Sequence, residues 1–279
     1  MKLADRFIDL STRPVPLRAL FFRKLLQIFP IGSWEMRVRA GAVERPHYAI
    51  CLRNAAWLAQ KLGYKAITVV EFGVAGGNGL MCLCNYAETI RRLYGVELRI
   101  VGFDSGAGLP ETHDLRDIHY IWPAGSFEMD RKALEARLAG RAELVLGDVA
   151  ETVPQWQPPA DAPLGAVMFD LDLYSSTRNA LPVLTKENVL PRVWCYFDDM
   201  AGHLETSLTD FVGEAAAIRE FNDDPARDAL RDNVSRARVF KHVAPESWHE
   251  RIYLYHRLLH PQYDLCLSKT RHQLELATS

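Results

Sequence analysis

The sequence has no excess of charge of either sign. Its 279 residues include 33 lysines and arginines against 35 aspartates and glutamates, a formal net charge of −2 at pH 7. Binding to nucleic acid or to a membrane surface usually needs a basic surplus, so we expect neither nucleic-acid binding nor stable membrane insertion. Hydrophobic residues make up 48% of the chain and charged residues 24%, which is typical of a folded protein with a sizeable core.

Long hydrophobic runs and a cysteine framework are also missing. No stretch approaches the ~18 apolar residues of a membrane-spanning helix, and Asp5, Arg6 and Asp9 interrupt any secretory signal. The five cysteines are an odd number without the spacing of a disulfide framework or a zinc site, so we expect reduced thiols, most of them buried. These absences predict a soluble, cytoplasmic protein.

One amphipathic segment lies near the N-terminus, in PLRALFFRKLLQIF (16–29). Its apolar face, together with Arg18, Arg23 and Lys24, could lie on a membrane surface. Packing on the protein's own core or on a partner subunit is commoner for such a helix, and we favour that interpretation. A homodimer that exchanges the N-terminal region is one form such packing could take.

Further along, the chain alternates short apolar runs with helical patterns. Each apolar run is almost continuously hydrophobic or β-branched, as in parallel strands covered on both faces. Two late runs, 238–243 and 251–259, are too close together for a crossover helix, so we expect an antiparallel hairpin there. The other expected elements are strands at 66–72, 98–104, 142–148, 165–170 and 193–198, and helices at 16–29, 47–62, 77–94, 131–139, 175–186 and 207–221.

This order of elements predicts an α/β fold. We expect a doubly wound, mostly parallel, seven-stranded Rossmann-like sheet with a C-terminal antiparallel hairpin, preceded by N-terminal helices. Residues 1–62 would form a helical extension that caps the domain or contributes to oligomerisation, and residues 63–279 would form the domain that carries the function. In such sheets, ligands bind beyond the carboxyl ends of the strands.

A glycine-rich turn follows the first strand, in VVEFGVAGGNGL (69–80). Glycines there let the backbone adopt positive φ and approach a ligand closely. The pattern differs from the dinucleotide one, because Ala75 replaces the middle glycine. Glu71, two residues before Gly73, would repel a pyrophosphate. It favours a ligand that carries positive charge, such as the amino and sulfonium groups of S-adenosylmethionine.

Acidic residues also end the second and third strands. Asp104 is placed to accept hydrogen bonds from ribose hydroxyls, like the acidic residue of nucleotide-binding folds. Asp148 could accept from the adenine amine. Either residue could instead be the N-cap of the helix that follows, and this alternative carries more weight for Asp148.

A second group of carboxylates follows the fourth and fifth strands. Asp170 ends AVMFD, and Asp198 and Asp199 end CYFDD. If these strands are neighbours, the three carboxylates converge, and their mutual repulsion favours a cation among them. Oxygen ligands suit Mg²⁺ or another hard divalent cation, which could hold a substrate hydroxyl and lower its pKa.

Asp172 and His203 are the candidates for a general base. Asp172 would face the same way as Asp170 if the chain stays extended. It could be a fourth metal ligand, the base that takes the hydroxyl proton, or a cap on the helix that starts near Ser175. His203 is an alternative base, although a surface or capping role is commoner for such a histidine. The long loop at 111–127 is predicted to be a lid over the acceptor.

Four segments resemble, in order, the macrocin O-methyltransferase family. They are RIVGFDSGAGLPE (99–111), LVLGDVAETVP (144–154), FDLDLYSSTRNAL (169–181) and VWCYFDDM (193–200). Members of this family are metal-dependent class I methyltransferases that act on sugars of macrolides and other natural products. The resemblance covers roughly residues 66–222, and the pairing of D-x-D-L-Y-x-S-T with a later F-D-D is its most specific part.

The resemblance implies both a metal site and a cofactor site. Asp198 and Asp199 would bind the metal together with Asp170, and Asp172 would act as the base. S-adenosylmethionine would lie among Glu71, Gly73, Asp104, Ser105 and Asp148. We also expect five neighbouring residues to contact the cofactor, namely Phe72, Val74, Gly77, Gly147 and Asp170.

The chain departs from the family at Gly106 and Ala107, where a bulky aromatic residue is usual, and at Met200, where a tyrosine is usual. These departures concern the acceptor more than the chemistry. We therefore predict an S-adenosylmethionine- and Mg²⁺-dependent O-methyltransferase that acts on a hydroxyl of a small natural product, for example on a sugar moiety. The alternatives are a metal-independent small-molecule methyltransferase, with Asp172 or His203 as base, and a non-catalytic nucleotide-binding module.

Overall fold

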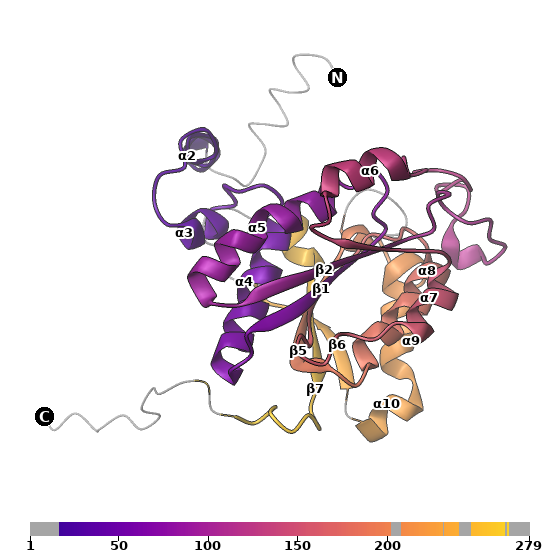
Figure 1. The fold of residues 1–279 in the computed structure, drawn as a ribbon. Coiled ribbons are helices and arrows are strands. Elements are labelled where there is room, and N and C mark those ends of the chain that lie inside the picture. The colour runs from indigo at the N-terminus through magenta and orange to yellow at the C-terminus, as the bar shows by residue number, and fades with distance from the viewer. Residues whose placement is uncertain (1–16, 202–207, 231, 240–246, 266, 268–279) are drawn as a thin grey trace, which may run out of the picture.

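A seven-stranded sheet forms the centre of the computed structural model, which describes residues 17–201, 208–230, 232–239, 247–265 and 267 (Figure 1). The order across the sheet is β3-β2-β1-β4-β5-β7-β6. The first five strands pair in parallel, and β7 lies antiparallel between β5 and β6, which confirms the predicted sheet. The strands are β1 (Ala66–Phe72), β2 (Glu97–Asp104), β3 (Glu143–Leu146), β4 (Leu164–Phe169), β5 (Val189–Phe197), β6 (Asp232–Arg236) and β7 (Ile252–Arg257).

Helices cover both faces of the sheet and enclose a hydrophobic core on each (Figure 1). One face carries α3 (Trp34–Arg39), α4 (Pro46–Leu62), α5 (Asn78–Tyr94) and α6 (Arg131–Leu138), with α2 (Leu17–Ile28) on the same side. The other carries α7 (Val149–Gln155), α8 (Tyr174–Ala180) and α9 (Gly213–Asp223), and α10 (Pro225–Leu230) follows α9. The expected helices at 16–29, 47–62, 77–94 and 131–139 are confirmed.

A row of four neighbouring aromatic rings runs across the sheet near the carboxyl ends of four adjacent strands. Successive ring centroids are 4.9, 5.4 and 4.5 Å apart. An acidic residue follows each of three of these strand ends directly, so the row is a rigid, fully buried base for the carboxylates above it. The rings belong to Phe103, Phe72, Phe169 and Phe197.

The edge strand lies earlier in the chain than expected. β6 spans Asp232–Arg236, residues 238–239 are irregular, and residues 240–243 of the expected strand lie outside the described residues. The side chain of Asn222 in α9 donates to the Val234 carbonyl and accepts from the Val234 N–H, both at 2.9 Å. This pairing satisfies the backbone N–H and carbonyl of Val234 on the edge strand, and a hydrophobicity pattern does not reveal it.

Several helix boundaries also differ from the sequence-based expectation. α9 begins at Gly213 and not near Ser207, which lies outside the described residues. The expected helix at 175–186 is α-helical only to Ala180 and continues as a 3-10 turn, Leu181–Thr185, because Pro182 cannot donate the next helical hydrogen bond. The short helices α3, α7 and α10 were not predicted.

Among the described residues, no helix is long and apolar enough to cross a membrane. Three large apolar residues of α2 do not pack into the core: Phe21, Phe22 and Ile28 are all more than half exposed. Dimerisation through this helix stays a prediction.

Candidate active site

A cavity of about 510 Å³ opens beyond the carboxyl ends of the parallel strands. Its size is typical of a small-molecule site, and its position is where open α/β sheets bind ligands. The structure brings most of the predicted site residues together on its walls, namely Gly73, Asp104, Ser105, Gly147, Asp148, Asp170, Asp172, Asp198 and Asp199.

Four predicted cofactor residues do not line this cavity, namely Glu71, Phe72, Val74 and Gly77. Phe72 belongs to the buried aromatic row, Val74 is buried in the core, and Gly77 precedes α5. His203 lies outside the described residues.

The turn after β1 is in very close contact with the end of β4. The Gly73 N–H donates to the Phe103 carbonyl at 3.0 Å, and the Asp170 N–H donates to the Phe72 carbonyl at 3.0 Å. Gly73 has φ +79°, and a Cβ there would lie 1.7 Å from the Asp170 carbonyl oxygen. Only glycine therefore fits at this position. It lies between the part of the cavity wall near Asp104 and the part formed by the carboxylates that follow β4 and β5.

Asp104 ties two loops of the cavity wall together. One of its carboxylate oxygens accepts from the Ala75 N–H at 2.8 Å, and the other accepts from the Gly106 N–H at 2.7 Å. It is therefore not a helix cap. Asp148, in contrast, is the N-cap of α7 and accepts from the Ala150 N–H at 2.8 Å. The sequence left this alternative open and gave it more weight for Asp148 than for Asp104.

Glu71 lies beneath the turn and is almost fully buried. The Tyr48 hydroxyl donates to Oε1 at 2.7 Å, and Oε2 has no partner among the described residues. Burial raises the pKa of Glu71 to about 8, although the hydrogen bond from Tyr48 acts in the opposite direction. At neutral pH Glu71 is therefore mostly protonated, so it can donate a hydrogen bond but supplies little negative charge.

The second half of the cavity is acidic, because Asp170, Asp172, Asp198 and Asp199 all line it. Burial, followed by the neighbouring carboxylates, raises the pKa of Asp170 to about 7 and that of Asp172 to about 8. Burial and then Asp198 raise the pKa of Asp199 to about 6. Such perturbed groups in a cavity are typical of a catalytic or cation-binding site.

Asp172 reaches the cavity by a different route from the one expected. The chain does not stay extended after Asp170: Asp172 has φ +61°, in the left-handed region. Its carboxyl forms a hydrogen bond with Asp199, which raises the pKa of Asp172 and lowers that of Asp199. Both directions correspond to a hydrogen bond in which Asp172 is the donor and Asp199 the acceptor.

Asp198 and Asp199 also make contacts outside the pair of Asp172 and Asp199. Arg251 donates to Asp198 at 2.9 Å, and the Tyr196 hydroxyl donates to the same oxygen at 2.5 Å. The Asp199 N–H donates to the buried carboxylate of Glu214 at 3.0 Å, whereas Asp199 Oδ2 is buried without a hydrogen-bond partner in the described structure.

No group of three or more histidine, cysteine or acidic side chains is arranged to hold a metal ion within the described ranges. The carboxylate of Asp198 is paired with Arg251 at 2.9 Å. The chemistry of the donors nevertheless fits a hard divalent cation, since the ligands offered are all carboxylate oxygens and one, Asp199 Oδ2, is a buried acceptor without a donor.

The loop between β2 and α6 forms the apolar wall of the cavity. Its two ends are joined by backbone hydrogen bonds, from the Leu109 N–H to the Ser126 carbonyl and from the Gly125 N–H to the Leu109 carbonyl, both at 2.8 Å. Trp122 and Phe127 face the cavity with ring centroids 6.2 Å apart. The loop therefore forms a closed structure that supplies an aromatic surface.

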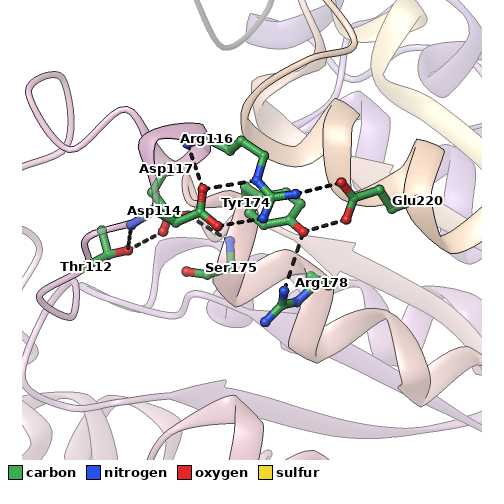
Figure 2. Close-up of polar contacts among 8 residues, drawn as sticks. All are labelled: Thr112, Asp114, Arg116, Asp117, Tyr174, Ser175, Arg178 and Glu220. Carbon is green, nitrogen blue, oxygen red and sulfur yellow. Dashed lines mark hydrogen bonds and ion pairs between the residues drawn. The ribbon is translucent and has the colours of Figure 1, made fainter.

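Figure 2 shows how the middle of this loop is fixed to the helices behind it. Arg116 donates to Glu220 of α9 at 2.7 Å, and its Cζ lies 3.9 Å from the centroid of the Tyr174 ring in α8. Arg116 also donates from two nitrogens to Asp114, at 3.0 and 2.7 Å. The loop wall is therefore held by an arginine between two carboxylates and an aromatic ring.

Asp117, which is fully buried, makes the second attachment of the loop (Figure 2). One of its oxygens accepts from the Ser175 N–H at 2.7 Å, and the Thr112 hydroxyl donates to the other. Asp117 thus caps α8, the role that the sequence left open for Asp172. The sequence missed Asp117, Glu214 and Arg251, because each acts through a partner that is remote in the chain.

Comparisons with known proteins give only distant similarities. No protein-family model matches the chain, and no curated protein matches it significantly. The resemblance to the macrocin O-methyltransferases therefore stays a prediction.

Solved structures that resemble the chain include the calicheamicin methyltransferase CalS11, with 21% identity over 88% of this chain and 93% of that one and a TM-score of 0.48. The O-methyltransferase TomG from Streptomyces achromogenes is 15% identical, the match covers 92% of this chain and 99% of TomG, and the TM-score is 0.42. An O-methyltransferase from Bacillus cereus is 13% identical, the match covers 84% of this chain and 95% of the Bacillus chain, and the TM-score is 0.41. The role of the cavity is therefore inferred from the chain's own residues.

Proposed function

We propose that the protein is an S-adenosylmethionine-dependent O-methyltransferase that acts on a hydroxyl of a small natural product, sugar hydroxyls included. The observation that carries this proposal is the division of one cavity into two halves. A glycine turn and Asp104 form a half suited to a nucleoside, and four carboxylates form the other. The two halves meet at Gly73, where a methyl group would pass between them.

In the first half, the cofactor's ribose would lie against Asp104. The carboxylate of Asp104 accepts hydrogen bonds from two backbone N–H groups and has further lone pairs that could accept from ribose hydroxyls. Adenine would lie near Asp148 and Val149, which also line this end of the cavity. The methionine part would lie near Gly73, above the buried Glu71. We propose the same cofactor role for Ser105, Gly147 and Asp170, which share the wall.

In the second half, Asp172 would be the base that takes the acceptor's hydroxyl proton, and Asp199 would position it through their hydrogen bond. Asp170, Asp198 and Asp199 would hold a hard divalent cation such as Mg²⁺. A bound cation would offset the repulsion among these carboxylates, lower the pKa of Asp172 and lower that of a substrate hydroxyl.

The acceptor would lie against the aromatic wall. Trp122 and Phe127 offer ring faces, and Leu109 and Pro110 extend the apolar surface. A hydroxylated ring, such as a sugar or an aromatic ring, could place one oxygen among the carboxylates and its carbon skeleton on this wall. Proximity and orientation would then supply much of the rate acceleration.

Calorimetric titration with S-adenosylmethionine and S-adenosylhomocysteine, in Mg²⁺ and then in EDTA, tests the proposal. We expect micromolar binding of both nucleosides and a loss of at least about tenfold in Asp104→Asn. Glu88→Gln, an exposed residue of α5, is the control. No binding of either nucleoside would reject the methyltransferase proposal.

One observation favours a second version of the reaction without a metal. Arg251 already places a positive charge on Asp198, 2.9 Å away, where the metal-dependent version puts a cation. In this version Asp172 alone activates the acceptor, in the molecules whose Asp172 carboxyl is ionised. Methyl transfer that is unchanged in EDTA would support this version, and transfer that is abolished by EDTA and restored by Mg²⁺ would support the metal-dependent one.

A further inference from the structure

A second cavity, of about 660 Å³, lies on the α4 side of the sheet, between α4 and the outer strands β5, β7 and β6. It shares no lining residue with the candidate active site. Part of its wall is apolar and comes from Ile50, Trp194, Val239 and Leu254. Trp194 is only partly buried, so part of its indole can be reached from this cavity.

The other part of the wall is strongly basic. Arg39 ends α3, Arg53 lies on α4, Arg236 ends β6 and Arg238 follows it, and all four line the cavity. Within the described part of the chain, no aspartate or glutamate lines it. Four guanidinium groups around one space repel one another, and in a chain whose net charge is close to zero such a concentration is not explained by the overall composition.

Few of these positive charges are neutralised. Arg236 pairs with Glu250 at 2.7 Å. Arg53 donates at 3.2 and 3.0 Å to the side-chain oxygen of Asn54, which is a neutral acceptor. Arg39 and Arg238 make no hydrogen bond or ion pair with any other residue that the structure describes. Three guanidinium groups are therefore without a carboxylate partner.

We propose that this cavity binds a small organic anion. Arg39, Arg53 and Arg238 would hold a phosphate or carboxylate group, since the planar guanidinium presents paired donors that match both. The indole of Trp194 and the side chain of Leu254 would cover an apolar ring of the same molecule. The volume is within the range of small-molecule sites. This site is independent of the proposed methyl transfer.

Four simple compounds separate the two parts of the proposed ligand. 2-Naphthyl phosphate and 2-naphthoate combine a ring with an anion, 2-naphthol lacks the charge, and inorganic pyrophosphate lacks the ring. In calorimetric titrations of the full chain we expect one or both naphthyl anions to bind at least about tenfold more tightly than 2-naphthol and pyrophosphate. Saturating S-adenosylhomocysteine should leave this binding unchanged, because the two cavities share no residue.

Arginine variants test the location. Arg53→Gln and Arg238→Gln should each weaken binding of the naphthyl anion by about tenfold. Arg91→Gln is the matched control: it changes the charge equally, and Arg91 is an exposed residue that pairs with Glu88 elsewhere on the surface. Because Arg238 is exposed, its replacement should leave the fold intact even if that of Arg53 does not.

Two results would overturn the proposal. One is the absence of binding by both naphthyl anions. The other is an equal loss in Arg238→Gln and in Arg91→Gln, which would mean that the anions respond to overall charge. Trp194→Leu gives an independent check, since it should reduce the advantage of 2-naphthyl phosphate over pyrophosphate.

Discussion

Arg116 lies over the ring of Tyr174, with its Cζ 3.9 Å from the ring centroid, and both side chains hydrogen bond to the carboxylate of Glu220. Three segments that are remote in the sequence, the cavity loop, α8 and α9, therefore meet at one carboxylate. α8 begins two residues after Asp172. The loop wall and the turn that carries the proposed base thus share one support.

This relationship predicts that Arg116→Ala affects ligand binding more than folding. The side chain is partly exposed, so its ion pair and cation–π contact should contribute only about 1 kcal/mol to the free energy of unfolding. Loosening the loop should weaken S-adenosylhomocysteine binding by about tenfold. Arg131→Ala, which breaks the exposed pair with Glu135, is the control for calorimetry and urea unfolding. Equal affinities in the two variants would contradict the prediction.

Asp117 should matter more for stability. Asp117→Ala leaves the Ser175 N–H at the start of α8 without its acceptor, in a place closed to water, and we expect a loss of about 1–3 kcal/mol in urea unfolding. Asp117→Asn keeps an accepting oxygen and should recover most of it. If both substitutions cost the same, the cap is not the source of the stability.

The sequence was a good guide to the sheet and to the row of acids, for one physical reason. Buried parallel strands are continuous apolar runs, and their carboxyl ends share one edge, so each acid that follows such a run can be placed without knowing any other contact. β1 was located at both of its ends, and Asp104, Asp170, Asp198 and Asp199 all line the cavity as expected.

The contacts that complete the site could not be predicted in this way. The acceptor for the Ser175 N–H comes from Asp117, 58 positions earlier, and the donor to Asp198 comes from Arg251, 53 positions later. Neither pairing leaves a periodic signal in the sequence. Asp172 was placed in the site on the assumption of an extended chain, whereas its left-handed backbone brings it there.

Repulsion in the acidic half predicts that Asp199→Asn stabilises the metal-free protein while it removes methyl transfer. Burial and the neighbouring Asp198 disfavour the charged form of Asp199 and raise its pKa. The amide side chain of an asparagine at this position would carry no charge, so its burial would cost less. At pH 8 in EDTA we expect a gain of at least about 1 kcal/mol in the free energy of unfolding. A destabilised variant that retains turnover would contradict both parts of the prediction.

The buried Glu71 predicts how stability changes with pH. Its pKa is raised from 4.5 to about 8 in the folded protein, so between these values the folded state binds a proton that the unfolded state has released. Stability from this group is therefore present at pH 4.5 and is lost as the pH rises towards 8, with a slope of up to about 1.4 kcal/mol per pH unit. Glu71→Gln should remove this contribution.

Urea unfolding of wild type and Glu71→Gln at intervals between pH 5 and pH 8 measures that difference. The control is Glu88→Gln, because Glu88 is exposed and its pKa is lowered, chiefly by its hydrogen bond with Arg91. We expect the wild type and Glu88→Gln to lose stability in parallel as the pH rises and Glu71→Gln to lose less. Three parallel curves would mean that Glu71 does not hold a proton in the folded protein.

Gly73 and Gly76 provide a matched pair within the same turn. A Cβ at Gly73 would lie 1.7 Å from the Asp170 carbonyl oxygen, and its φ of +79° is unfavourable for any other residue, whereas a Cβ at Gly76 meets nothing within 4 Å. Gly73→Ala must therefore push the turn away from β4. We expect it to lose at least about 2 kcal/mol of stability and most S-adenosylhomocysteine binding.

Gly76→Ala should change the free energy of unfolding by about 0.5 kcal/mol or less and leave nucleoside affinity within about twofold of wild type. Calorimetry and urea unfolding of the two variants side by side measure both effects. If Gly73→Ala bound the nucleoside as well as Gly76→Ala does, the contact between the turn and β4 would not be needed for binding. The cofactor would then have to lie elsewhere than between Gly73 and the carboxylates, and the proposed path of the methyl group would be wrong.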